Sequence, residues 1–389
     1  MPRERVALAA IISLAALVFF GWVVQTRMEN LSMPEPPSKM FGQPIRLDDM
    51  AKKDILTTPT AEETGKVSRL PVLAENMPEF AGITRWLNSN PLRQEELRGK
   101  VVLIDFWTYS CINCIRTLPY IVSWDKKYRG LGLVIIGVHT PEFAFEQKES
   151  NVRDALKRHG IAYPVAMDND YGTWNAYGNR YWPAKYLFDA EGRLRYAHFG
   201  EGEYDVTEKN IQDLLADAGG VAAEAPVTVI PESTDFSKIG TSETYLGYGR
   251  MEYQANEEEI LRDRVQEYVL PADVARNRFA YGGRWLVRSE NGTLAEAPGS
   301  VVIRYVASGV NLVMGAETSA VRAEVLIDGK PVPVGMRGAD LVVQGGRTYM
   351  RVSAERLYNV IDAKGAYGEH LLEIRFLDAG VRVYAFTFG

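Results

Sequence analysis

The spacing of apolar residues divides the chain into segments of different character. Apolar positions run almost without interruption through Val101–Trp107 and again through Leu131–Val138. Runs of this kind are typical of strands that are buried on both faces of a parallel sheet. Helical patterns follow over Ile115–Tyr128 and over Ser150–His159. Residues 70–218 are therefore predicted to form an α/β domain with a mixed sheet.

Shorter segments complete this predicted domain. Tyr163–Met167 is a brief extended run, and Tyr186–Asp189 with Leu194–Phe199 has the pattern of a β-hairpin around a glycine-containing turn. A helix over Lys209–Ala218 closes the domain.

Beyond residue 240 short β-type runs replace the alternation of strands and helices. Nine such runs, with turns between them, cover residues 283–288, 300–305, 310–314, 321–327, 341–343, 347–353, 357–361, 370–377 and 381–388. Asp328-Gly329 is a hairpin turn signal between two of them. Glu257–Val269 is predicted to be helical. Residues 240–389 are therefore predicted to form an all-β sandwich of the jelly-roll kind.

The N-terminus has the pattern of a membrane anchor. Val6–Val24 is free of charged residues and is preceded by Arg3 and Arg5. As a helix it would extend about 28 Å, close to the hydrocarbon thickness of a bilayer. A cleaved signal peptide is the alternative, but its apolar core is usually shorter and ends in small residues. We therefore predict a single transmembrane helix that is not cleaved.

The remaining boundaries and the location follow from this anchor. The domain plan is an anchor over 1–24, linkers over 25–69 and 219–239, and globular regions over 70–218 and 240–389. The basic flank predicts a cytoplasmic N-terminus, which places the rest outside, on the periplasmic side of a cell membrane. The net charge of −6 argues against a nucleic-acid partner.

The candidate chemistry lies in the two cysteines of the chain, Cys111 and Cys114. They stand between the first apolar run and the helical pattern that follows, which is the layout of a redox pair. A thiol at a helix N-terminus is favoured as thiolate, and a second thiol one turn later can resolve a mixed disulfide. Zinc is the alternative, but a structural zinc site needs four ligands and there is no second cysteine pair.

These residues resemble a known family. Asp105-Phe106-Trp107, Cys111-Ile112-Asn113-Cys114, Pro119 and Trp182-Pro183-Ala184 resemble the thioredoxin fold, and Gly137-Val138-His139-Thr140-Pro141-Glu142-Phe143 adds a likeness to the extracytoplasmic part of DipZ proteins. That part pairs a redox domain of the TlpA/ResA kind with a carbohydrate-binding-module-like sandwich.

The resemblance implies a function and its partners. It implies a thiol–disulfide oxidoreductase that reduces protein disulfides, of the kind found in cytochrome c biogenesis. No cofactor is implied beyond the redox-active disulfide Cys111–Cys114, and no metal. DipZ proteins carry a multi-span electron-conducting domain in front of this part, whereas one span is predicted here. Its electrons would have to come from a separate membrane donor of the CcdA/DsbD type, and the sandwich is a candidate for binding envelope glycan.

Residues around the pair have candidate roles. Asp105 ends a buried strand below the cysteines, where a desolvated carboxylate could take a proton from Cys114; a hydrogen-bonded strand-end acid is the alternative. The resemblance implies a cis peptide before Pro183, beside which a substrate chain could pair; a proline that starts a strand is the alternative. We expect the aromatic residues nearest the motif, Trp107, Tyr109 and Trp182, to contact substrate.

His139 follows the second buried strand and is expected at the same sheet edge as Cys111, because the carboxyl ends of parallel strands meet there. It could stabilise a thiolate or move protons, and an ordinary loop histidine is the alternative. His159, His198 and His370 are interpreted as structural or solvated residues.

Other functions remain open at this point. A copper chaperone could use the two thiolates and a histidine, although such proteins space their cysteines differently. Thr108 lies three residues before Cys111, as in a peroxidase, but Ile104 stands where those enzymes have proline. A glycan- or protein-binding module with a vestigial redox domain is a further alternative. Aromatic residues of the sandwich could stack on sugars but are more often core: Tyr281, Trp285, Tyr305, Tyr349, Tyr358 and Tyr367.

Overall fold

The structure is a computed structural model that describes residues 70–219, 226–230, 234–317 and 319–389. The predicted anchor over 1–24, the linker over 25–69 and part of the linker over 219–239 lie outside these residues. Within the described ranges, none of the helices combines the length and the apolar character that crossing a bilayer requires.

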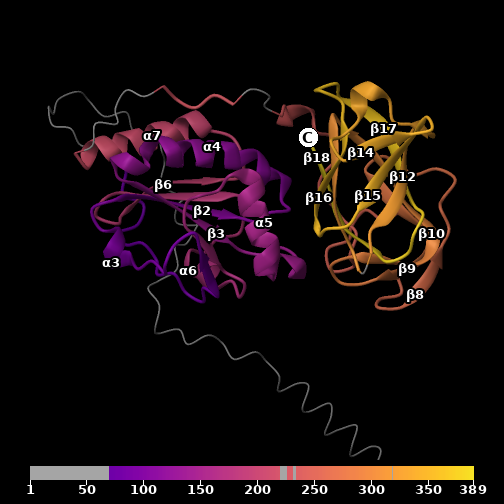
Figure 1. Ribbon diagram of the computed structural model, residues 1–389, viewed down its shortest axis with the longest axis horizontal. Helices are drawn as coiled ribbons and strands as arrows, with labels where there is room; N and C mark the ends of the chain where they lie inside the picture. Colours follow the sequence, from indigo (N-terminus) through magenta and orange to yellow (C-terminus); the bar gives the residue numbers. More distant parts are fainter. Residues whose placement is uncertain (1–69, 220–225, 231–233, 318) are drawn as a thin grey trace, which may run out of the picture. The chain divides into compact units, whose positions relative to one another are not determined.

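Residues 70–219 form an α/β domain around one mixed sheet (Figure 1). The strand order is β1-β4-β3-β2-β5-β6, with β2 parallel to β3 and β3 parallel to β4. The other pairings are antiparallel. The strands are β1 Arg85–Leu87, β2 Val101–Trp107, β3 Leu133–His139, β4 Val165–Met167, β5 Ala184–Phe188 and β6 Leu194–Phe199.

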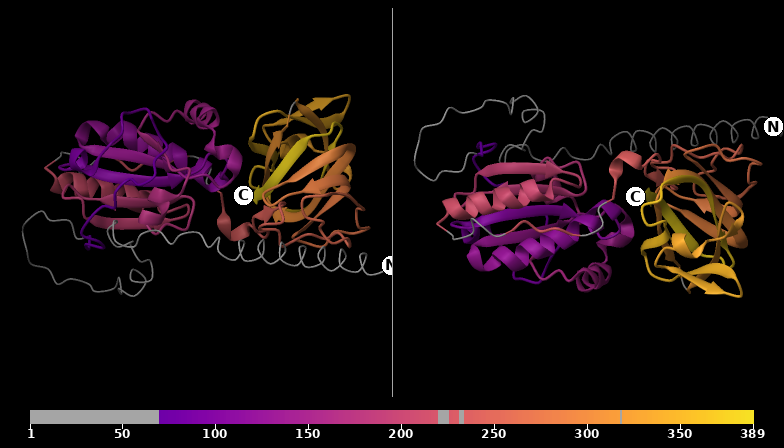
Figure 2. Two further views of the ribbon diagram at one scale, coloured as in Figure 1. Left: turned by 90° about the horizontal axis from the view of Figure 1, so that it is seen from below. Right: turned by 90° about the horizontal axis from the view of Figure 1, so that it is seen from above.

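Helices cover both faces of this sheet. The α-helices are α3 Gln94–Leu97, α4 Ile112–Tyr128, α5 Glu149–His159, α6 Gly172–Ala176 and α7 Tyr204–Asp217, with short 3₁₀ turns η1 Arg129–Leu131 and η2 Ala144–Gln147. Figures 1 and 2 show α4 and α7 side by side on one face, where Trp124 and Ile211 pack against Leu103 of β2. On the other face α3 and α6 contribute Leu97 and Trp174 to a second cluster.

The predicted elements of this region are confirmed in type and close in extent. Every side chain of β2 is buried, as an unbroken apolar run predicts, and the predicted hairpin forms as β5 and β6. The helix predicted over Ser150–His159 is α5, and Gly160 ends it with a φ of 65°. The predicted final helix is α7, which begins five residues earlier than the pattern indicated.

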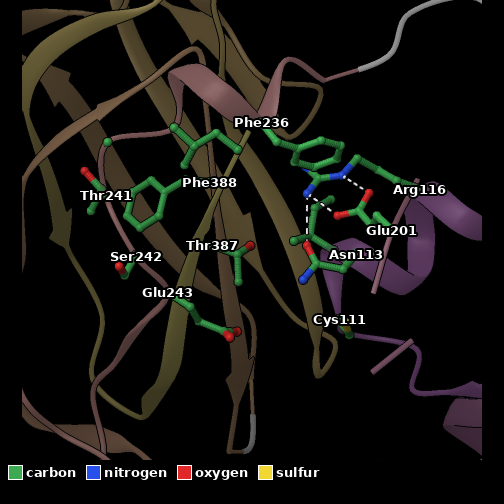
Figure 3. Close-up of a pocket in the computed structure, with 13 residues that line it drawn as sticks. Cys111, Asn113, Arg116, Glu201, Phe236, Thr241, Ser242, Glu243, Thr387 and Phe388 are labelled. Carbon is green, nitrogen blue, oxygen red and sulfur yellow. Dashed lines mark hydrogen bonds and ion pairs between the residues drawn. The ribbon is translucent and has the colours of Figure 1, made fainter. Parts of the chain in front are cut away.

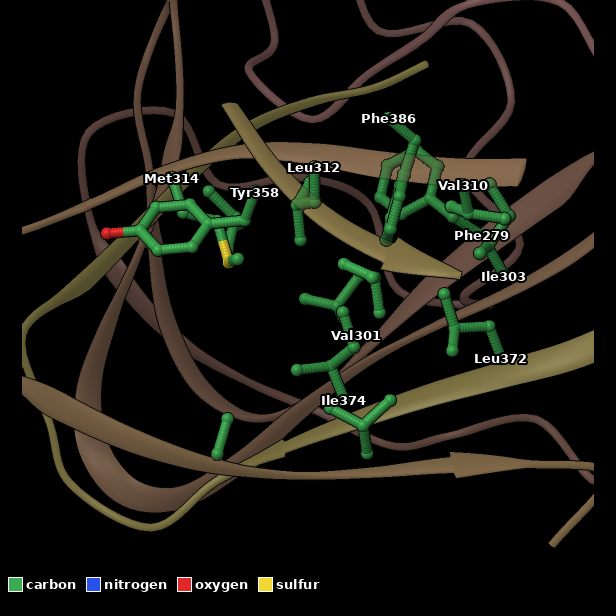
Figure 4. Packing of buried hydrophobic residues seen from close by; sticks show 14 of the residues in the cluster. Phe279, Val301, Ile303, Val310, Leu312, Met314, Tyr358, Leu372, Ile374 and Phe386 are labelled. Atoms are coloured by element: carbon green, nitrogen blue, oxygen red, sulfur yellow. The ribbon is translucent and has the colours of Figure 1, made fainter. Parts of the chain in front are cut away.

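Residues 234–389 form a β domain with a core of its own (Figure 4). The short 3₁₀ turns are η3 Phe236–Lys238 and η4 Val334–Met336. The strands are β7 Thr244–Tyr245, β8 Val265–Tyr268, β9 Arg278–Val287, β10 Gly292–Ala307, β11 Gly309–Ala316, β12 Val321–Ile327, β13 Lys330–Pro331, β14 Leu341–Gln344, β15 Arg347–Val352, β16 Arg356–Asp362, β17 Gly368–Phe376 and β18 Val381–Phe388.

The all-β prediction is confirmed, but the prediction of two stacked sheets needs correction. The main hydrogen-bonded path runs β14-β15-β12-β17-β10-β18-β11-β16, and the remaining strands pair onto it. One large antiparallel sheet therefore encloses the core. The 16-residue strand β10 explains the continuity, because it pairs with β18 at Gly292 and Thr293 and with β17 over Gly299–Ala307, while β9 pairs along its other edge.

The helix predicted over Glu257–Val269 is wrong. The first half of this segment lies in loops and turns, where Asp263 has a φ of 58°, and the second half contains β8. Strand β8 pairs with β9 and buries Tyr268, so pairing with the sheet overrides the local helical preference. The predicted Asp328-Gly329 turn is confirmed, and both of its residues have positive φ, as a tight hairpin requires.

Candidate active site

Cys111 and Cys114 lie at the start of α4, just beyond the carboxyl end of β2. Cys111 is the N-cap residue of the helix and is partly exposed, whereas Cys114 is 1% exposed. The backbone N–H of Cys114 donates to Cys111 Sγ at 3.4 Å. This hydrogen bond and the positive end of the helix dipole both favour negative charge on that sulfur. Both cysteines are free thiols in the structure.

Cys114 differs from Cys111 in its surroundings. Burial raises the pKa of the Cys114 thiol well above its usual range, and the proximity of Cys111 and Asp105 adds to this rise. The inner thiol is therefore protonated at neutral pH until a base removes its proton. One accessible sulfur and one shielded sulfur is the arrangement that a nucleophile and a resolving thiol require.

Asp105 lies in β2 and is 1% exposed. Neither carboxylate oxygen has a hydrogen-bond partner among the described residues. Burial raises the pKa of Asp105 to about 7, and the positive charge of Lys185 opposes this rise. The alternative of a hydrogen-bonded strand-end acid is therefore not supported. A carboxylate with this pKa can gain and lose a proton near neutral pH, as a general base must.

Lys185 is a site residue that the sequence analysis missed. It is the register partner of Asp105 on β5, is fully buried, and donates from Nζ to the Gly200 carbonyl at 3.2 Å. Burial lowers the pKa of Lys185, while the charges of Asp105 and Cys114 oppose this effect. The available signal was one lysine inside the otherwise apolar strand Ala184–Phe188.

His139 ends β3, in register with Trp107, so the predicted shared sheet edge is confirmed. Its imidazole is fully buried, lies 3.4 Å from Thr108 Oγ1 through Nε2, and stacks on Tyr109. Burial lowers the pKa of His139 to about 3. The ring is therefore neutral at pH 7 and brings no positive charge to a thiolate.

Glu146 is a second residue that sequence reasoning missed. It lies in η2, is fully buried, and accepts hydrogen bonds from Ser110 N and Oγ at 3.2 and 2.6 Å. It also accepts from the backbone N–H groups of Glu142 and Phe143 at 2.6 and 3.0 Å. One carboxylate therefore fixes the residue before Cys111 to the loop after β3. Burial raises the pKa of Glu146 to about 7.

The predicted substrate contacts are corrected in two of three cases. Trp107 is fully buried and Tyr109 is 2% exposed, so both belong to the core instead of the surface. Trp107 lies against Gly137, where a Cβ atom would meet its Nε1 at 2.9 Å, and the Tyr109 hydroxyl donates to the Glu355 carbonyl at 3.3 Å. Trp182 is partly exposed, and the peptide between Trp182 and Pro183 is cis, as the resemblance implied.

Within the described ranges no group of three or more His, Cys, Asp and Glu side chains is arranged to hold a metal ion. Four of the six sandwich aromatics, Tyr281, Trp285, Tyr305 and Tyr358, are fully buried in the β-domain core and cannot stack on a sugar. Tyr349 and Tyr367 are partly exposed.

Two sequence families match the two regions of the chain. Residues 73–215 match the Redoxin family, and residues 241–389 match the family described as the thioredoxin-like C-terminal domain. A solved thioredoxin-like protein in its oxidised form is 32% identical, covers 37% of this chain and 97% of its own, and has a TM-score of 0.35.

Two bacterial relatives extend the comparison. The protein DipZ of Mycobacterium bovis is 40% identical over 318 residues, which are 80% of this chain and 42% of that relative. The chain thus spans less than half the length of DipZ. The thiol-disulfide oxidoreductase YkuV of Bacillus subtilis is 31% identical over 145 residues, which are 37% of this chain and 97% of YkuV.

Proposed function

Because the chain belongs to the thioredoxin-like thiol-disulfide oxidoreductases, we propose that it reduces disulfides of other proteins through Cys111 and Cys114. The supporting observation is the contrast between the two thiols. Cys111 is partly exposed at the N-terminus of α4, and Cys114 is buried one turn later beside a carboxylate that titrates near pH 7. A thiol–disulfide exchange cycle requires this inequality.

In the first step the Cys111 thiolate attacks one sulfur of the substrate disulfide. A bond forms between Cys111 Sγ and that sulfur, and the second substrate sulfur leaves as a thiolate and takes up a proton from solvent. The N–H of Cys114 and the dipole of α4 favour the attacking thiolate. The product of this step is a mixed disulfide.

In the second step Cys114 attacks Cys111 Sγ. Asp105 accepts the Cys114 proton, the Cys111–Cys114 bond forms, and the first substrate sulfur leaves as a thiolate. Two electrons have then passed to the substrate. The positive charge of Lys185 assists because it attracts the negative charge that Asp105 carries before the transfer and that Cys114 carries once it has lost its proton.

The proposal also covers the electron donor and the cellular location of the chain. The oxidised pair has to be reduced again by a dithiol, for which we propose a separate membrane protein of the CcdA/DsbD type. Val6–Val24 would anchor the chain in a cell membrane, with the redox domain on the periplasmic side. The match to part of DipZ supports this setting.

Insulin reduction by dithiothreitol tests the proposal. The wild-type chain is expected to accelerate the reaction, and Cys111→Ser is expected to lower the catalysed rate by at least about 10³-fold because the nucleophile is lost. Cys114→Ser should accumulate a mixed disulfide with its substrate. Ser353→Ala, an exposed serine of the β domain, is the matched control and should keep the wild-type rate. Equal rates for wild type and Cys111→Ser would defeat the proposal.

A further inference from the structure

Cys111 faces a cleft that both domains line. The cleft has a volume of about 510 Å³. Figure 3 shows Cys111, Asn113, Arg116 and Glu201 on one side and Thr241, Ser242 and Glu243 on the other. The nucleophile of the redox domain is therefore confined by a second wall that the β domain supplies.

The first wall is held by a network of charged and polar groups. Arg116, in the second turn of α4, donates from Nε to Glu201 Oε2 at 2.9 Å and from Nη2 to Glu201 Oε1 at 2.8 Å. The same guanidinium donates to Asn113 Oδ1 at 3.0 Å, and it lies over the ring of Phe236 at 5.4 Å from the centroid. Because Arg116 is hydrogen-bonded to both Glu201 and Asn113, this wall of the cleft is held in place beside Cys111.

The second wall is anchored to the β domain by backbone and side-chain hydrogen bonds. Gly240 N donates to the Val306 carbonyl at 2.9 Å, and Val306 N donates to Thr241 Oγ1 at 2.7 Å. Thr244 then pairs with Phe386 of β18. Between these anchors Ser242 is exposed to the cleft and forms part of its lining. Residues 240–244, which form this second wall, are therefore held against the β domain at both ends.

The two walls are also bound to each other. Glu142, in the loop that carries Glu146, accepts hydrogen bonds from Tyr245 and Arg250, both at 2.8 Å. Tyr384 of β18 packs against Phe143 and Phe145 of the same loop at centroid distances of 5.2 and 4.8 Å. Polar and apolar contacts together keep the cleft at its observed width.

From this geometry we infer that the β domain makes Cys111 favour disulfides carried by extended polypeptide segments over those of compact protein surfaces. The inference rests on the proposed function and names its substrate class. The cleft volume falls in the range of small-ligand pockets, about 300–1,000 Å³, so an extended segment reaches Cys111 more readily than a compact protein surface does. The lining combines aromatic faces from Phe236 and Phe388 with hydroxyl and carboxylate groups, which suits side chains and main-chain groups of a single extended strand.

Thiol labelling tests the confinement without any turnover. In Cys114→Ser the remaining thiol is Cys111. Iodoacetamide, a small reagent, should label Cys111 in the folded chain. The second reagent is a maleimide that bears a long polyethylene glycol chain, and the measured quantity is the ratio of its labelling rate to that of iodoacetamide. This ratio should be at least about tenfold lower in the folded chain than in the urea-unfolded chain. If the ratio of the two labelling rates were the same in the folded and the unfolded chain, the inference would be overturned, whatever the protein's activity.

Filling the cleft tests the substrate class. Ser242→Trp should lower the rate on an unstructured disulfide-linked peptide by about tenfold or more while leaving a small aromatic disulfide within about twofold of wild type. Ser150→Trp, an exposed serine of α5 that lines none of the described clefts, is the matched control. The inference would be overturned if the wild-type chain reduced a compact folded protein as fast as the peptide. It would also be overturned if the wild-type chain reduced only the small aromatic disulfide. No activity on any disulfide would instead defeat the proposed function.

Discussion

The two domains bury different kinds of residue. Among the described residues, each buried Asp, Glu, Lys, Arg and His lies in the redox domain, between residues 105 and 208. The buried polar residues beyond residue 240 are Ser, Thr and Asn. Two aromatic polar atoms of the β-domain core donate to the backbone, Tyr281 OH to Leu246 O at 2.7 Å and Trp285 Nε1 to Gly282 O at 2.9 Å. The buried hydroxyls of Tyr268 and Tyr305 have no hydrogen-bond partner among the described residues.

This difference indicates that the redox domain performs the chemistry and that the β domain supports it structurally. A buried ionisable group costs stability unless it is paired, so a fold retains several only where they perform a task. Asp105, with both oxygens unpartnered, is such a group in the redox domain. Among its described residues the β domain buries no Asp, Glu, Lys, Arg or His side chain, and it supplies one wall of the cleft beside Cys111.

Removing a β-domain aromatic should produce the largest loss of stability. Trp285→Ala is expected to lower the free energy of unfolding by about 3–5 kcal/mol, because Trp285 is fully buried at the centre of the apolar core. Urea denaturation measures this change. Insulin reduction well below the unfolding transition should stay at the wild-type level. A loss of activity in the folded variant would assign chemistry to the β core and break the comparison.

Asp105→Asn should have the opposite effect on stability. The folded-state pKa of about 7 lies above the ordinary value. Asp105 therefore does not destabilise the fold below about pH 4, and it destabilises the fold more and more as the pH rises from 4 to 7. The variant should therefore gain up to about 4 kcal/mol at pH 8 and almost nothing at pH 4, since each pKa unit corresponds to about 1.4 kcal/mol.

Denaturation of wild type and variant at pH 4, 6 and 8 measures this difference. The variant should also be slower in the second step of the cycle, by about 10²-fold, because no base accepts the Cys114 proton. A stability difference that does not change with pH would contradict the titration assigned to Asp105. Lys185→Met offers a complementary variant, in which the pKa of Asp105 should rise further.

Glu146 tests whether a buried acid can serve positioning instead of proton transfer. Glu146→Ala removes the acceptor of four hydrogen bonds and should cost about 2–3 kcal/mol, since buried donors at Ser110 and in the following loop are left unsatisfied. Glu146→Gln keeps an acceptor oxygen and should cost less. Urea denaturation of both variants at pH 8 decides the point, and equal losses would show that the carboxylate charge itself is required.

The sequence predicted some of these features and missed others for physical reasons. Cys111, Cys114 and Asp105 are close in sequence, and their placement follows from one strand and one helix, both of which have clear patterns. Lys185 and Glu146 reach the site only through sheet register and loop packing, which local patterns do not encode. The exposure of Tyr109 was misjudged because the second domain covers this residue, and that of Trp107 because its ring packs against Gly137 inside the redox domain.

The fold shows the same division. The nine predicted β runs are confirmed because each depends on local alternation and turn residues. Whether they build two sheets or one depends on pairing between distant strands, such as β10 with β17. The segment Glu257–Val269 has a helical charge pattern, yet the gain from burying Tyr268 against β9 decides its structure.

The smallest effect is expected at the surface between the domains. Lys148 and Glu355 form an ion pair at 2.6 Å, but the lysine side chain is 57% exposed. A double-mutant cycle with Lys148→Met and Glu355→Gln should give a coupling free energy of at most about 1 kcal/mol, because solvent screens such a pair. A coupling above about 2 kcal/mol would mean that this contact contributes to joining the domains more than the apolar packing of Tyr384.

The central claim is that Cys111 and Cys114 form a reversible two-electron couple. Its most direct test is an equilibrium titration of the chain against reduced and oxidised glutathione, with free thiols counted by labelling after acid quench. The account predicts that both thiols disappear together along one transition and return fully when the glutathione ratio is reversed. Thiols that stay labelled across the whole series, or that form only mixed disulfides with glutathione, would contradict it.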